Sequence, residues 1–185
     1  MLAITAGKTD SFPFGIFVDE AGESIAKRWW LLHTKSRQEK AVSRDLHSRQ
    51  IGFYLPLLRR QSLVRGRLFE SLAPLFPSYV FLFGTDEDRI TALRTNRLAA
   101  AHAVADDESL RVDLEQIARL IATGAPLTPE ARLEPGQRVR VKSGPCIGFE
   151  GTLIKRHGKS RLVVRVEQLF QGASVEIEDY RLEAI

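Results

Sequence analysis

Apolar and polar positions follow two different rhythms along the 185 residues of this chain. Up to about residue 125, short apolar runs typical of strands alternate with segments whose apolar residues recur every three or four positions, as in helices. From about residue 134, single apolar residues alternate with polar ones, which predicts short half-buried strands. We therefore expect an α+β domain over 27–125, a linker over 126–133 and a small all-β domain over 134–185.

The first domain is predicted to be an antiparallel sheet with helices packed on it. Strands are expected at 28–34, 53–57, 79–83 and near 101–105, and helices after Ser36, after Thr85 and over 112–123. Ser36 and Glu39 have the spacing of a capping box, in which each side chain bonds the other's backbone N–H. Residues 59–67 are rich in arginine, and we expect a polar loop there. Residues 1–26 lack periodicity and predict a flexible leader.

The second domain shows five short strands with tight turns in some 50 residues, which predicts a small β-barrel. Its alternating apolar positions are Val139, Val141, Leu153, Leu162, Val164, Val166, Val175 and Ile177. Gly144 and Pro145 turn the chain. Gly148 and Gly151 let the backbone pass where a side chain would crowd a small barrel.

Positive charge is concentrated in one part of the chain. The net charge is +4 and the isoelectric point near 9.5, yet residues 27–69 alone carry about +9. Lys35, Arg37, Lys40 and Arg44 lie in this part, on and beside the helix expected after Ser36. Such a face is often only solvated, but it also suits sequence-tolerant contacts with nucleic-acid phosphates.

The residue types that carry enzyme chemistry are scattered. The four histidines have no metal-ligand spacing, Cys146 is the only cysteine, and no glycine-rich phosphate cradle is present. Asp106, Asp107 and Glu108 are interpreted as a solvated turn. We therefore expect no catalytic residue, no metal and no cofactor. A single cysteine and the lack of a long apolar run predict a cytoplasmic protein without membrane contact.

Two stretches resemble a known family. Residues 139–153 resemble a KOW motif, and residues 74–81 (PLFPSYVF), preceded by the Trp29–Trp30 strand and its helix, are similar to an NGN domain. Leu169 and Phe170, followed by 175–177, resemble the last strands of the same family. The chain is thus similar to the NusG/RfaH family of transcription elongation and antitermination factors. The fold implied is an NGN-type antiparallel sheet with helices, followed by a small SH3-like KOW barrel.

The resemblance implies a bacterial factor that binds the clamp helices of the largest RNA polymerase subunit, suppresses pausing or termination, and recruits a partner through its KOW domain. It implies a monomer. The polymerase contacts would be His33, Phe76, Pro77, Tyr79 and Phe81, and the contacts with upstream or non-template DNA would be Lys35, Arg37, Lys40, Arg44 and Arg97. Val80 and Leu82 are expected in the core, on the other face of the strand.

In the KOW domain, Leu169 and Phe170 would bind the partner, a ribosomal protein or the termination factor Rho. Residues 171–173 lack the arginine that accompanies this aromatic residue in NusG, and Phe170 also fits an ordinary barrel position. Another class of function fits the KOW motif alone: an RNA-binding or ribosome-associated protein without polymerase contact. The barrel carries only about +2, which favours the polymerase interpretation, because ribosomal modules are usually far more basic.

Overall fold

The computed structural model describes residues 11–13, 16–17, 27–132, 136–178 and 181–185. The chain splits into two compact units, one ending at Asp107 and the other beginning at Glu108. We call them the N-terminal and C-terminal units. Most of the leader expected over 1–26 lies outside the described residues. Its described part is not a free leader, because Ser11 and Phe12 pair with a strand of the N-terminal unit.

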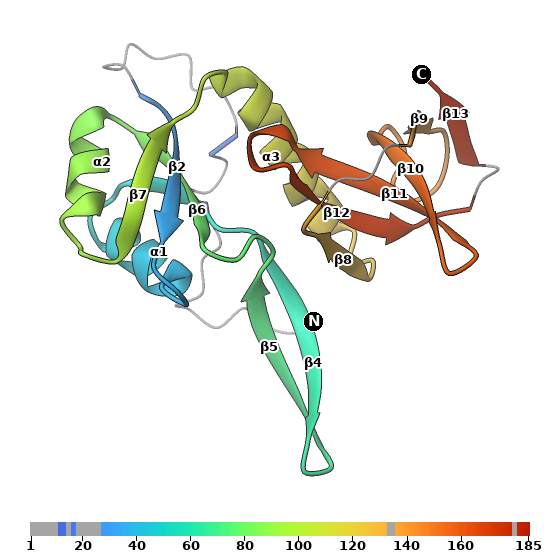
Figure 1. Ribbon diagram of the computed structural model, residues 1–185, viewed down its shortest axis with the longest axis horizontal. Helices are drawn as coiled ribbons and strands as arrows, with labels where there is room; N and C mark the ends of the chain where they lie inside the picture. The colour runs from blue at the N-terminus through green and yellow to red at the C-terminus, as the bar shows by residue number, and fades with distance from the viewer. Residues whose placement is uncertain (1–10, 14–15, 18–26, 133–135, 179–180) are drawn as a thin grey trace. The chain divides into compact units, whose positions relative to one another are not determined.

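The N-terminal unit contains a five-stranded antiparallel sheet in the order β1-β3-β6-β2-β7 (Figure 1). Its elements are β1 (Ser11–Phe12), β2 (Arg28–Thr34), α1 (Glu39–Ser48), β3 (Gly52–Tyr54), β6 (Tyr79–Gly84), α2 (Asp86–Leu93) and β7 (Leu98–Ala103). The strands expected at 28–34 and 79–83 are confirmed, and they pair with each other at the centre of the sheet. The expected α+β class is correct.

One face of this sheet packs on the two helices. Leu32 and Val80 point to that face from neighbouring strands and join Val42 and Leu46 of α1 in a core that also includes Ala92 of α2. These side chains are at most 1% exposed. Apolar positions in α1 recur every three or four residues. As expected, this spacing places the apolar side of the helix toward the sheet.

The two helix starts differ from each other. Thr85 and Asp88 form a complete capping box at α2. The capping box expected from Ser36 and Glu39 is wrong: α1 begins at Glu39 and has no side-chain cap. Arg37, between the two, has a φ of 59°, which is incompatible with helical backbone. The Glu39 side chain is buried and bonds a distant backbone group instead.

The arginine-rich segment expected as a loop is a β-hairpin. β4 (Leu57–Val64) pairs with β5 (Arg67–Pro74) along their full length. Arg65 and Gly66 connect them with positive φ angles of 50° and 75°. A two-residue turn with both φ angles positive matches the twist of a hairpin, and glycine adopts it without a steric penalty. Figure 1 shows β4 and β5 as a long two-stranded arm.

The C-terminal unit contains a six-stranded antiparallel sheet in the order β13-β9-β10-β11-β12-β8. Its elements are α3 (Asp107–Ala122), β8 (Leu127–Glu130), β9 (Gln137–Val141), β10 (Glu150–Arg156), β11 (Lys159–Val166), η1 (Glu167–Leu169), β12 (Gln171–Glu176) and β13 (Leu182–Ala184). The alternating valines Val139, Val141, Val164 and Val166 are buried as expected. A Cβ on Gly151 would lie 2.4 Å from the backbone oxygen of Val163, so strand packing requires glycine there.

The boundary between the units differs from our expectation. Residues 127–130, expected within a linker, form β8 and pair with β12. Pro129 is tolerated because β8 is an edge strand. Glu130 is buried and accepts hydrogen bonds from Ser174 Oγ (2.6 Å) and Arg156 Nη1 (3.0 Å). The division after Asp107 also groups nearly all of α3 with the barrel strands, whereas we expected this helix in the first domain.

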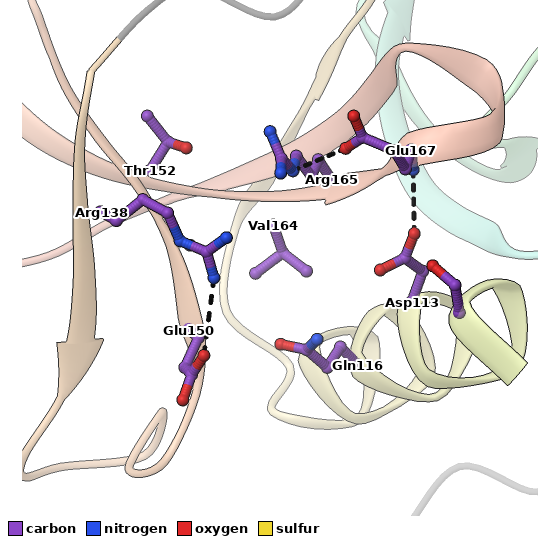
Figure 2. Close-up of a pocket in the computed structure, with 10 residues that line it drawn as sticks. Asp113, Gln116, Arg138, Glu150, Thr152, Val164, Arg165 and Glu167 are labelled. Atoms are coloured by element: carbon purple, nitrogen blue, oxygen red, sulfur yellow. Dashed lines mark hydrogen bonds and ion pairs between the residues drawn. The ribbon is translucent and has the colours of Figure 1, made fainter. Parts of the chain in front are cut away.

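Helix α3 contacts the barrel through polar and aromatic groups. Asp113 accepts a hydrogen bond from the backbone N–H of Glu167 at 2.9 Å, and the Arg119 guanidinium lies 5.0 Å from the Phe149 ring centre. A cavity of about 250 Å³ separates part of the helix from β9, β10 and β11. Figure 2 shows its charged side chains in pairs, Arg138 with Glu150 and Arg165 with Glu167. The two ion pairs therefore neutralise most of the charge on the cavity wall.

Burial raises the pKa of the Asp113 carboxyl above its ordinary value, although the Glu167 N–H opposes the shift; the Glu167 carboxylate raises it further and Arg165 lowers it. A raised folded-state pKa means that the folded chain binds the proton more tightly than the unfolded chain. The contribution of this group to stability is therefore complete at pH values below its ordinary pKa. It is lost as the pH rises through the raised pKa of the folded state. We predict that Asp113→Asn, which keeps an acceptor oxygen, raises the melting temperature relative to wild type more at pH 7.5 than at pH 4. An equal difference at both pH values would contradict this.

Candidate functional site

The turn between β5 and β6 is fixed by three hydrogen bonds. The backbone N–H of Ser78 donates to Glu39 Oε1 at 2.7 Å, and its carbonyl accepts from the N–H of Thr34 at 2.8 Å. The N–H of Tyr79 donates to the carbonyl of Phe76 at 3.2 Å. Ser78 has a φ of 68°, a left-handed conformation that an isolated serine rarely adopts. The buried Glu39 carboxylate thus holds the backbone immediately before Tyr79 in one conformation.

This turn presents an aromatic pair. His33 of β2 lies directly opposite Tyr79 of β6 in the sheet register. Their ring centres are 5.2 Å apart with an interplanar angle of 23°, which is a stacked arrangement. Both side chains are half-buried, and Pro77 beside them is exposed. We call His33, Pro77 and Tyr79 the turn surface.

Phe76 and Phe81 differ from our expectation. Both were expected on an open partner face, yet they are 1% and 0% exposed, and their rings meet edge to face at 6.1 Å. The structure therefore gathers all five expected polymerase residues around one turn and the two neighbouring strands β2 and β6, but only those of the turn surface are accessible. Phe76 and Phe81 are interior residues that support the turn.

The five expected DNA-contacting residues form two groups. Arg37 and Arg44 are exposed, and within the described part of the chain no carboxylate pairs with either guanidinium. The others bond to the protein itself. Lys35 donates to Asn96 Oδ1 at 2.8 Å, Lys40 donates to the carbonyl of Leu72, and Arg97 donates to Asp45 Oδ2 at 2.8 Å and Gln38 Oε1 at 2.7 Å.

The two residues expected to bind the KOW partner differ in exposure. Phe170 is 70% exposed, follows η1 and has a φ of 51°, whereas Leu169 is buried in the barrel. The expected turn at Gly144 and Pro145 is present, with φ angles of 90° at Gly144 and 82° at Gly148. Sequence reasoning missed Ile147, which is 60% exposed in this turn. The sequence signal for this exposure was its position between Gly144 and Gly148, because residues at the tip of such a turn face solvent.

Burial raises the pKa of the Cys146 thiol, so little of the nucleophilic thiolate forms near neutral pH. Among the described residues, no group of histidine, cysteine and acidic side chains could hold a metal ion. In the same residues, no helix is long and apolar enough to cross a membrane.

Comparison with known proteins gives one consistent result. A family model described as "Transcription termination factor nusG" matches residues 27–121. The chain is 27% identical over 181 residues to the transcription termination/antitermination protein NusG of Pseudomonas aeruginosa, with 87% of this chain and 100% of that protein covered. It is 28% identical over 179 residues to the protein of the same name from Staphylococcus aureus, with 86% and 97% covered.

A solved chain from an MjSpt4:Spt5 complex aligns with 85% of this chain and 96% of its own length, at 15% identity and a TM-score of 0.27. That overlap is too weak to support an argument about either fold or function. The family model, by contrast, covers more than half of the chain and includes the turn surface and both of its strands. On that match, the chain belongs to the NusG family of transcription termination and antitermination factors.

Proposed function

We propose that this chain binds RNA polymerase through its N-terminal unit, with the turn surface contacting the clamp helices of the largest subunit. The observation that carries the proposal is the stacked pair of His33 and Tyr79 on a turn fixed by Glu39. Rigid, partly exposed aromatic side chains are the residues that most often dominate binding energy at protein interfaces. A preorganised turn also loses little conformational entropy when it binds.

Binding would act on transcription by favouring one polymerase conformation. A factor that binds a closed clamp more tightly than an open one shifts the equilibrium toward the closed form by the ratio of the two affinities. A preference of about 1.4 kcal/mol gives a tenfold shift. Suppression of pausing or termination then follows without a catalytic residue.

Arg37 and Arg44 would add contacts with upstream or non-template DNA. Both guanidinium groups are exposed, so they can bind phosphates without breaking an internal ion pair. Lys35, Lys40 and Arg97 already bond groups of this chain, and we assign them mainly to positioning α1 and its flanking loops. Phosphate contacts of this kind carry no sequence information.

The C-terminal unit would recruit a second partner, a ribosomal protein or Rho, through Phe170. An aromatic side chain that is 70% exposed at the end of a short helical turn is available to another protein. Leu169 is buried behind it and would support rather than contact the partner.

The first prediction from this proposal concerns the turn surface. Tyr79→Asp should weaken binding of the full chain to core RNA polymerase by about 30-fold, because loss of a hot-spot tyrosine costs about 2 kcal/mol or more. Phe170→Asp places the same charge on an exposed aromatic residue of the other unit and should leave this affinity unchanged. Titration of both variants against labelled polymerase gives the comparison, with circular dichroism as the test of folding.

Equal binding by folded Tyr79→Asp and wild type would contradict the turn surface as the contact. No binding by the wild-type chain would contradict the polymerase proposal altogether. RNA and ribosome pull-downs would then test the other class of function that the KOW motif suits.

A second prediction concerns Glu39. Glu39→Ala leaves the partly buried N–H of Ser78 without its acceptor and should lower the free energy of unfolding by about 1–3 kcal/mol. It should also weaken polymerase binding, because Tyr79 loses its fixed position. Glu39→Gln retains an acceptor oxygen and should recover most of both losses. Chemical denaturation and the same binding titration measure the two effects. An alanine variant with unchanged polymerase affinity would show that the turn needs no such support.

A third prediction concerns DNA. Arg37→Ala combined with Arg44→Ala should reduce the slope of log affinity against log salt for duplex DNA by about 1.8, since each phosphate contact contributes about 0.9. Arg132→Ala, an exposed arginine of the C-terminal unit, serves as the control and should leave the slope unchanged. An unaltered slope in the double variant would exclude Arg37 and Arg44 as phosphate contacts.

A further inference from the structure

The β4–β5 hairpin is an exposed, strongly basic arm that the proposed function does not use. Residues 59–63 and 65–70 are exposed on both strands. They include four arginines and one carboxylate, that of Glu70, which accepts a hydrogen bond from Gln61 Nε2 at 2.9 Å. Among the described residues, no carboxylate pairs with an arginine of this arm. The arm therefore keeps nearly all of its positive charge available for a ligand.

The strand register sorts the side chains of the arm onto two faces. Residues directly opposite each other share a face, and the face alternates along each strand. Ser62 opposes Phe69 and Arg60 opposes Ser71, so Arg60, Arg67 and Phe69 lie together on what we call the arginine face. Leu63 opposes Leu68 and Gln61 opposes Glu70, and these four residues lie on the other face with Arg59, the leucine face.

Phe69 is 52% exposed at the centre of the arginine face. Arg67 lies two residues before it on the same strand, about 7 Å away. Arg60 lies diagonally across on β4, also within about 7–8 Å by backbone spacing. An aromatic ring with a guanidinium on either side cannot enter an apolar core without desolvating both charges, which costs several kcal/mol for each ion. The cluster is therefore suited to a ligand that offers both a flat π surface and negative charge.

Unpaired nucleotides offer that combination. Their bases can stack on an exposed aromatic ring, and their phosphates can bond flanking arginines. In a duplex the bases stack on one another, which leaves no free face for Phe69. An acidic peptide would match the charge of Arg60 and Arg67 but offers no flat π surface for the exposed ring of Phe69. The ring between the two arginines thus favours a single strand.

The geometry points to a binding site for single-stranded nucleic acid on the arginine face of the β4–β5 hairpin. One base stacks on Phe69, and the neighbouring phosphates bond Arg60 and Arg67. Arg65, in the turn at the tip of the arm, extends the phosphate path. The site is separate from the turn surface and from Arg37 and Arg44, so it does not depend on the proposed polymerase contact.

The test uses the full chain and fluorescein-labelled oligonucleotides, oligo-dT and oligo-U, followed by fluorescence anisotropy. Phe69→Ala should weaken binding by about 5- to 150-fold, the range for loss of one stacked base. Arg60→Ala combined with Arg67→Ala should reduce the salt slope by about 1.4, at about 0.7 for each single-strand phosphate. Leu68→Ala and Arg59→Ala are the matched controls on the leucine face and should change the affinity less than twofold. Comparison of oligo-dT with oligo-U identifies the kind of strand.

Ultraviolet crosslinking followed by mass spectrometry gives a second readout and should place the crosslinked base on Phe69. Three results would overturn the proposal: no binding of either oligonucleotide, equal losses for Phe69→Ala and Leu68→Ala, or equal affinity for a duplex of the same length. Binding of an acidic peptide, lost on Phe69→Ala while oligonucleotides do not bind, would assign the face to a protein instead. Phe69→Ala should keep polymerase affinity and Tyr79→Asp should keep oligonucleotide affinity, so failure of one proposal leaves the other standing.

Discussion

The hydrogen bond from the Ser78 backbone N–H to the Glu39 carboxylate is the constraint on which the candidate interface depends. It joins the first residue of α1 to the turn that precedes β6, two segments 39 residues apart in sequence. Because the carboxylate is buried, its loss would leave an unsatisfied N–H at a residue already held in left-handed backbone. The position of Tyr79, and with it the stacking on His33, follows from this bond and from the pairing of β2 with β6.

The same sheet separates a stabilising face from a binding edge. The helix-covered face buries Leu32, Val80 and Leu82 completely, so the two central strands are fixed by apolar packing. The polar and aromatic residues at the strand ends therefore need not hold the strands in place, and they need only keep their side-chain conformations. The β4–β5 arm has the opposite character: its outer half contributes little to the core and exposes arginines and one phenylalanine. The proposed polymerase contact and the proposed nucleic-acid contact therefore lie on separate parts of one unit.

The sequence predicted the elements with strong periodicity and missed those fixed by distant partners. The strand at 79–83 is apolar on both faces, and the strand at 28–34 is a compact apolar run, so local pattern located both. Glu39 has the spacing of a helix cap, and no local signal distinguishes that role from a bond to Ser78. The arginines of residues 59–67 suggested a loop, although the segment forms a hairpin. The turn at Arg65 and Gly66 was the sequence feature that could have indicated it. Phe76 and Phe81 were expected at the surface from the family resemblance. Their burial depends on tertiary packing, which the local sequence does not show.

A photocrosslinking amino acid at position 79 of the full chain, mixed with core RNA polymerase, tests the polymerase contact most directly. We predict a crosslink to the clamp helices of the largest subunit, and none to those helices from the same probe at position 170. A probe at position 79 that crosslinks only elsewhere on the polymerase, or not at all while the protein is bound, would contradict the turn surface as the site of contact.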